Sequence, residues 1–157
     1  QQPQFSGSSY LHYQRYRLDL ARWQQLTQPQ QEAIMGRKKM DGSLLAMAQR
    51  LENSHANKAA LIDAQNQPLP LLLQNMPFGQ LKVQGLLCLG FSCHGDTYPK
   101  WLAGRVGYPL DQATTESSSM TEAGLADYDL LLDYTQADAG AVFFAPSISF
   151  IEQQAGL

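Results

Sequence analysis

Two apolar segments near the middle of the chain constrain its fold more than any other feature. Leu69–Asn75 is almost continuously apolar, and Gly85–Cys93 is a second such segment that follows after a short interval. Apolar runs of this length are typical of strands that are buried on both faces. Pro77 and Gly79 are expected to end the first strand. The pair therefore predicts two buried strands joined as an antiparallel hairpin.

The residues before this hairpin predict one strand and two short helices. Residues 8–17 combine alternation with aromatic side chains, which favours a strand. Asp19 is a suitable N-cap for a short helix. Thr27 and Gln30 form a capping-box signature for a second helix, which we expect to end at Gly36 in a left-handed conformation. A long connection without periodicity then leads to His55, and loops of that length are often functional.

The residues after the hairpin predict two helices, a loop, a short helical segment and a fourth strand. They are a helix from Asp96 or Thr97 to Gly107, an exposed loop over 111–127, one to two helical turns over Asp129–Tyr134, a strand over Ala139–Pro146 and a tail helix over Ile148–Ala155. Four strands and two crossover helices in this order are compatible with a ferredoxin-like split βαβ fold of the α+β class. That fold has a four-stranded antiparallel sheet with helices on one face.

Length and charge exclude some classes of function. At 157 residues the chain is long enough for one domain with a substantial core. A net charge of −3 at pH 7 argues against binding to nucleic acid, because phosphate contacts need clustered Lys and Arg. No apolar run approaches the roughly 20 residues of a membrane span. We also expect no signal peptide ahead of the fold.

The two cysteines indicate a reducing compartment. Cys88 and Cys93 lie five positions apart in one predicted strand, so their side chains point to opposite faces and a disulfide between them is not expected. We therefore predict a cytoplasmic location. Cys93, His94 and Asp96 suggest a metal cluster, but no second Cys or His stands at ligand spacing, and we reject it.

His55 is a candidate metal ligand of a different kind. It precedes the apolar Leu71–Leu73 run, a layout that suits a buried cofactor with a ligand on one side and a strand on the other. Imidazole often holds haem iron as a single proximal ligand. For a histidine considered alone, a surface position or a hydrogen-bonded core position is the commoner role.

Several short motifs around His55 occur in a fixed order along the chain. They are Ser6-Gly7-Ser8-Ser9-Tyr10, Gln14-Arg15-Tyr16-Arg17, Trp23, Gln31-Glu32, Gly36-Arg37-Lys38-Lys39, Asn53-Ser54-His55, Asn75-Met76-Pro77-Phe78 and Phe143-Phe144-Ala145-Pro146-Ser147. Together they resemble the C-terminal half of a dye-decolorising (DyP-type) haem peroxidase, from Gly7 to about Ser147. The resemblance implies a single ferredoxin-like haem-binding domain over residues 1–157. It also implies haem b (iron protoporphyrin IX) as the cofactor, and either a homo-oligomer or pairing with an N-terminal half that this chain lacks.

The resemblance assigns roles on the proximal side of the haem. His55 resembles the ligand of the iron, and its other ring nitrogen is expected to donate to a carboxylate near the final strand. Asp133 is the first candidate for that carboxylate and Asp129 the second; an ordinary exposed acid is the alternative for either. Arg37 resembles a residue that contacts a haem propionate or the access channel, and a solvent-exposed arginine is the alternative.

The distal side departs from the family pattern. The family uses an aspartate from a Gly-x-x-Asp-Gly motif, which this chain lacks, together with an arginine and an asparagine. Asn75 keeps the asparagine and is the catalytic candidate, but Leu73 stands where the arginine is expected. Cys88 replaces a typical distal aromatic residue, and Phe144 is expected in the apolar lining.

The resemblance implies a haem peroxidase that reduces hydrogen peroxide while it oxidises a small aromatic or dye-like donor. Leu73 predicts that this activity is weak, because leucine cannot stabilise a developing peroxide anion. A haem-binding or carrier protein without peroxidase turnover is the alternative. A third class is a haem-free assembly domain in which His55 has no ligand role.

Overall fold

The computed structural model describes residues 5–62, 67–80, 83–108 and 127–156. The chain divides into two compact units. The first comprises residues 1–17, 70–98 and 137–157, and the second comprises residues 18–69 and 99–136. The predicted exposed loop over 111–127 lies, except for its last residue, outside the described part of the chain.

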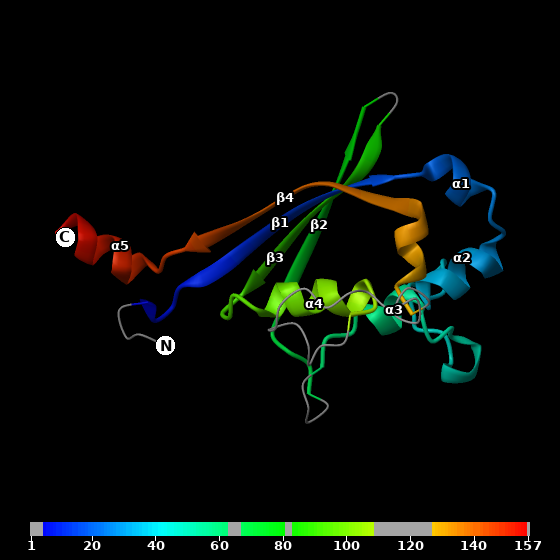
Figure 1. The fold of residues 1–157 in the computed structure, drawn as a ribbon, viewed down its shortest axis with the longest axis horizontal. Helices are drawn as coiled ribbons and strands as arrows, with labels where there is room; N and C mark the ends of the chain where they lie inside the picture. The colour runs from blue at the N-terminus through cyan, green and yellow to red at the C-terminus, as the bar shows by residue number, and fades with distance from the viewer. Residues whose placement is uncertain (1–4, 63–66, 81–82, 109–126, 157) are drawn as a thin grey trace. The chain divides into compact units, whose positions relative to one another are not determined.

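A four-stranded antiparallel sheet is the main feature of the first unit (Figure 1). Its strands are β1 (Ser9–Leu18), β2 (Leu72–Gly79), β3 (Gln84–Ser92) and β4 (Thr135–Ala145), in the order β2-β3-β1-β4. β3 pairs antiparallel with both β2 and β1, so Cys88 lies opposite Asn75 on one side and Gln14 on the other. This order and the intervening helices confirm the predicted ferredoxin-like α+β fold.

The predicted hairpin is present, but its first strand differs from the expectation. β2 continues through Pro77 to Gly79 instead of ending near Asn75. It is also not buried on both faces, since every residue is exposed or half-buried and Leu72 is 66% exposed. The reason is that β2 is an edge strand, where a proline without an N–H group is tolerated. β3 lies inside the sheet and contains the buried positions Gly85, Cys88, Gly90 and Ser92.

His12 and Tyr98 form the most enclosed contact of the first unit. His12 of β1 is 1% exposed, and its ring stacks on that of Tyr98 with centroids 4.6 Å apart and planes 13° apart. Gly90 lies opposite His12 in the β1–β3 register. A Cβ atom at Gly90 would come within 2.5 Å of the Tyr98 ring, so the absence of a side chain there makes room for the stack.

A charge cluster joins β1 to β4. Arg15 Nε lies 2.7 Å from Asp138 Oδ1, and Arg17 also contacts the Asp138 carboxylate. Hydrogen bonding to Arg15 is the main reason that the pKa of Asp138 falls to about 2. These two arginines of the Gln14–Arg17 motif therefore have a structural partner within the sheet.

The helices of the second unit begin and end largely where the sequence predicts. α1 (Leu20–Gln24) starts after Asp19, whose carboxylate accepts a hydrogen bond from the Arg22 backbone N–H at 3.0 Å. α2 (Gln28–Met35) has the predicted capping box and ends at Gly36, which has a φ of +70°. A Cβ atom there would lie 2.9 Å from Ser54 Oγ, so Gly36 also permits close packing beside His55.

The connection between Gly36 and His55 is more ordered than predicted. It contains an isolated β-bridge between Arg37 and Leu44 and the 3₁₀ helix η2 (Met47–Gln49). His55 begins the short helix α3 (His55–Lys58).

Three further helices complete the described chain. They are α4 (Thr97–Arg105), the 3₁₀ helix η4 (Leu130–Tyr134) and α5 (Ile148–Ala155). The bounds of α5 equal the prediction. Among the described helices, none has the length and apolarity needed to cross a lipid bilayer.

Candidate functional site

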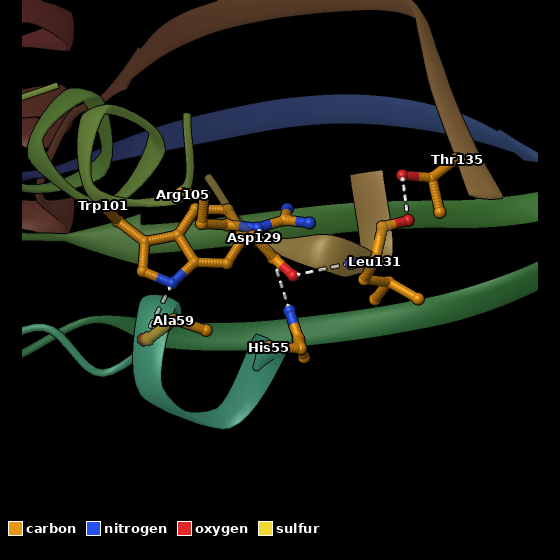
Figure 2. A network of polar contacts seen from close by, with 7 residues as sticks. All are labelled: His55, Ala59, Trp101, Arg105, Asp129, Leu131 and Thr135. Carbon is orange, nitrogen blue, oxygen red and sulfur yellow. Dashed lines mark hydrogen bonds and ion pairs between the residues drawn. The ribbon is translucent and has the colours of Figure 1, made fainter. Parts of the chain in front are cut away.

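The side chain of His55 is fixed by a hydrogen bond to a buried carboxylate. His55 Nδ1 lies 2.7 Å from Asp129 Oδ2 (Figure 2). Asp129 has no exposed surface, whereas the His55 side chain remains 25% exposed. The contact spans 74 positions of sequence, so it depends on the packing of the second unit and not on local chain geometry.

Backbone contacts hold Asp129 in place. It is the N-cap of η4, and its Oδ1 atom accepts a hydrogen bond from the Leu131 N–H at 2.9 Å. The Asp129 N–H donates to the carbonyl of Arg105 at 2.7 Å, and the next N–H, of Leu130, donates to the carbonyl of Asn53 at 3.1 Å. The carboxylate is therefore presented by a segment tied to both α4 and the turn before His55.

Arg105 contacts the same carboxylate oxygen. Arg105 Nε donates to Asp129 Oδ2 at 2.7 Å, and Arg105 is 4% exposed. Its guanidinium lies over the ring of Trp101, 4.9 Å from the centroid. Trp101 in turn donates from Nε1 to the carbonyl of Ala59, at the end of α3, at 3.1 Å (Figure 2).

Contacts with His55 and Arg105 keep Asp129 ionised. Burial raises the pKa of its carboxyl, but the hydrogen bond and charge of His55 and the charge of Arg105 lower it, and the net pKa lies below its ordinary value. An ionised carboxylate only accepts hydrogen bonds, so the proton of the contact is on Nδ1 of His55. In the neutral ring, Nε2 then carries the lone pair, and it makes no hydrogen bond or ion pair with any described residue.

This geometry fits a histidine that ligates a metal. Such histidines usually donate their second ring N–H to a carboxylate, which fixes the ring and raises its basicity. Within the described ranges, His, Cys, Asp and Glu side chains do not gather in groups of three or more that could hold an ion by themselves. A cofactor metal that takes one protein ligand, such as haem iron, needs only the single accessible Nε2.

The sequence predicted Asp133 as the first candidate for the carboxylate that contacts His55, and this prediction is wrong. Asp133 is exposed, and its Oδ1 atom accepts a hydrogen bond from the Tyr128 hydroxyl at 2.8 Å. Asp129, the second candidate, is the partner. The two acids differ in burial, because Asp129 caps the buried start of η4 while Asp133 lies near its exposed end.

Arg37 lies beside a cavity of the second unit. Its side chain is exposed, and Nη1 donates to the carbonyl of Gly42 at 2.9 Å. The cavity measures about 310 Å³ and is also lined by Trp23, Met35 and Lys39. A haem contact of Arg37 stays a prediction.

The other predicted site residues belong to the sheet of the first unit. Leu73 is half-buried and Asn75 is exposed, and they share one face of β2 because they are two residues apart. Cys88 is buried on β3 directly across from Asn75. Phe144 of β4 is 44% exposed, and its ring contacts those of Phe5 and Tyr10, with centroids 5.5 and 5.8 Å away.

Comparison with known proteins identifies the family. The family model described as Dyp-type peroxidase, C-terminal, matches residues 1–150. The chain belongs to this family. The dye-decolorizing peroxidase of Mycobacterium tuberculosis (strain H37Rv) is 30% identical over 152 residues, which are 94% of this chain and 41% of that protein. That of Rhodococcus erythropolis is 28% identical over 153 residues, 96% of this chain and 40% of that protein.

Solved DyP-type structures have the same fold. A putative DyP-type peroxidase from Shewanella oneidensis matches 97% of this chain and 45% of its own, with a TM-score of 0.82 and 33% identity. An arginine-to-leucine variant of Rhodococcus jostii RHA1 DypB was solved in complex with heme. The match covers 96% of this chain and 44% of that chain, with a TM-score of 0.81 and 27% identity. The chain thus spans less than half the length of these DyP-type relatives.

Trp101 and Arg105 are site residues that the sequence did not reveal. Both residues lie in the helix predicted from Asp96 or Thr97 to Gly107, but the sequence indicates no functional role for either. One signal was present, since an aromatic residue and an arginine four positions apart lie on the same side of a helix. Nothing local indicates that this face of the helix contacts Asp129 and the end of the helix that His55 begins.

Proposed function

We propose that this chain acts as the haem-binding domain of a DyP-type peroxidase and holds haem b through Nε2 of His55. The observation that carries the proposal is the 2.7 Å contact of His55 Nδ1 with the buried Asp129 carboxylate, which leaves Nε2 accessible. Membership of the DyP-type family supports the same ligand. When bound, haem would supply the iron at which hydrogen peroxide is reduced and an aromatic or dye-like donor is oxidised.

The proximal residues orient and strengthen the ligand. Asp129 holds the imidazole ring in one tautomer, and its negative charge increases electron donation from Nε2. Arg37 is proposed to retain the cofactor through a propionate, since a guanidinium binds a carboxylate in a bidentate manner. Its exposed position beside the loop carbonyl of Gly42 leaves further donor nitrogens for that role.

On the distal side, Asn75 is proposed to donate a hydrogen bond from its amide to the peroxide substrate. Leu73 supplies no hydrogen-bond donor, so charge that develops as the O–O bond breaks receives less stabilisation. Cys88 and Phe144 would contribute apolar lining.

A haem-binding or carrier protein without efficient turnover is the second candidate, and Leu73 is the observation that favours it. An arginine-to-leucine variant of DypB was solved in complex with heme, so haem binding in that protein tolerates the loss of one arginine. Both candidates need the same ligand and differ only in the reaction with peroxide.

We also make proposals about the partners of the chain and its cellular compartment. We propose that the chain works with an N-terminal half or as a homo-oligomer, because it spans about 40% of its curated relatives. We also propose a reducing, cytoplasmic setting, because Cys88 and Cys93 form no disulfide.

The test uses haem titration of the purified protein and two matched histidine variants. Wild type and His94→Ala, which changes an exposed histidine, should give one haem per chain and a strong Soret band. His55→Ala should lose that band or show the spectrum of weakly bound haem. An unchanged spectrum and haem affinity in His55→Ala would remove His55 as the ligand. Rapid mixing of the wild type with hydrogen peroxide then separates a peroxidase from a carrier.

A further inference from the structure

Two residues on one face of α4 contact the surroundings of His55 at two separate places, the end of α3 and the Asp129 carboxylate. Trp101 and Arg105 are four residues apart on this helix, and each is 4% exposed. Trp101 bonds the carbonyl of Ala59, at the end of the short helix that His55 begins. Arg105 donates to the Asp129 carboxylate, which also accepts the hydrogen bond from His55 Nδ1 (Figure 2). The helix thus fixes both the backbone that carries the histidine and the acid that orients its ring.

Arg105 and His55 share one acceptor atom. Both donate to Oδ2 of Asp129, each at 2.7 Å, while Oδ1 accepts the Leu131 N–H. Two donors on one oxygen compete for its electron density, so the hydrogen bond to either is weaker than it would be alone. The guanidinium also carries a permanent charge, and Asp129 has no contact with solvent that could screen it.

The charge of Arg105 therefore opposes the charge that Asp129 applies to His55. A lone buried carboxylate would pull strongly on the Nδ1 proton and give the ring imidazolate character. With the guanidinium on the same oxygen, part of the negative charge is compensated and the proton stays on Nδ1. The ring of Trp101, under the guanidinium, supports the cation in this buried position.

We propose that Arg105 is a positioning residue that limits the donor strength of His55 by sharing Oδ2 of Asp129. The proposal rests on the proposed role of His55 as haem ligand. On this proposal, α4 not only packs within the second unit but also sets the electron density at Nε2 of His55. A purely structural ion pair would stabilise the fold but would leave the ligand unaltered.

The decisive variant is Arg105→Gln, which keeps a donor group and removes the charge. In the haem-loaded protein we expect a lower ferric–ferrous midpoint potential and a higher iron–histidine stretching frequency, because His55 becomes the stronger donor. Arg105→Lys should restore both values toward wild type. Lys58→Gln is the matched control, because Lys58 lies on α3 but pairs with Asp127. A glutamine variant with wild-type values for both quantities overturns the proposal.

A measurement without haem separates this inference from the proposed function. In the haem-free protein, proton NMR should place the Nδ1 proton of His55 further downfield in Arg105→Gln than in wild type, because its hydrogen bond to Asp129 strengthens, and near the wild-type position in Arg105→Lys. If His55→Ala keeps its haem spectrum, the proposed function fails, and this proton shift still reports the sharing of Oδ2. If His55 is the ligand but the proton shift does not respond, the inference fails alone.

If Arg105→Gln does not fold, two other results still test the proposed role of Arg105. Arg105→Lys, which keeps the charge, should have a midpoint potential close to that of wild type. The haem-free wild type should also show a hydrogen-bonded proton on Nδ1 of His55. A large change of potential in Arg105→Lys, or an unprotonated Nδ1, would contradict the proposal.

Discussion

At the scale of single residues, Leu73 is the position at which the resemblance to the family leads us to expect an arginine. It is half-buried on β2 and shares a face of the strand with Asn75. If an arginine is replaced there, one oriented donor is lost, and such a loss typically lowers a rate by about a hundred- to a thousandfold. We predict that Leu73→Arg raises the rate of reaction with hydrogen peroxide by roughly that factor, as measured by rapid mixing.

Leu72→Arg is the control for this prediction. Leu72 is the adjacent residue, so its side chain points to the opposite face of β2, and it is already 66% exposed. It should leave the rate near that of wild type. Equal acceleration by both variants, or a fast wild type that gains nothing, would show that Leu73 does not limit the reaction.

Residues also show what the sequence could and could not predict about the site. His55 was predictable because a motif surrounds it. Its acid was not, because Asp129 and Asp133 are equally polar, and only the burial of the start of η4 separates them. Arg105 was hidden for a related reason: its contact with Asp129 joins positions 24 residues apart.

At the scale of elements, the stacked contact between β1 and α4 predicts a dependence of stability on pH. Burial lowers the pKa of His12, whose ring stacks on Tyr98. The unfolded chain therefore binds the proton more readily than the folded chain. The stability from neutral His12 is complete above the ordinary value of 6.5 and is lost as the pH falls from there through the folded-state pKa.

His12→Phe should remove this dependence while it keeps a ring against Tyr98. We predict that the free energy of unfolding in urea falls less for His12→Phe than for wild type between pH 7.5 and pH 5.5. His94→Gln, a change at an exposed histidine, should behave like wild type. Equal losses in His12→Phe and wild type would mean that His12 does not titrate on unfolding.

Element boundaries were predictable where they depend on local chemistry. The cap at Asp19, the capping box at Thr27 and the left-handed Gly36 all act within a few residues, and all are present. The extent of β2 was not predictable in this way. It depends on whether the strand lies at the edge of the sheet, and the strand order is fixed by pairings between distant segments.

At the scale of the whole molecule, cofactor binding should contribute to stability by mass action. A ligand that binds only the folded state adds about 2.7 kcal/mol when its free concentration is a hundred times Kd. We predict an increase of this size for wild type and His94→Ala when haem is present, measured by urea unfolding with and without haem. His55→Ala should gain much less, and an equal gain would point to haem bound without this ligand.

The overall fold was predictable from the sequence, whereas the residues needed for a complete active site were less predictable. The order of strands and helices, together with the family motifs, was enough for a four-stranded ferredoxin-like sheet. The Gly-x-x-Asp-Gly motif does not occur in the sequence, and the chain spans about 40% of its curated relatives.

The placement of the two tryptophans has a consequence for spectroscopy. Trp23 packs edge-on against Tyr134 with centroids 5.2 Å apart, and Trp101 is buried under Arg105. Both belong to the second unit, and the sequence contains no other tryptophan. Intrinsic tryptophan fluorescence therefore reports on that unit alone. Opening of the sheet would need a separate signal, such as the reaction of a thiol reagent with buried Cys88, so the two units can be followed independently in one experiment.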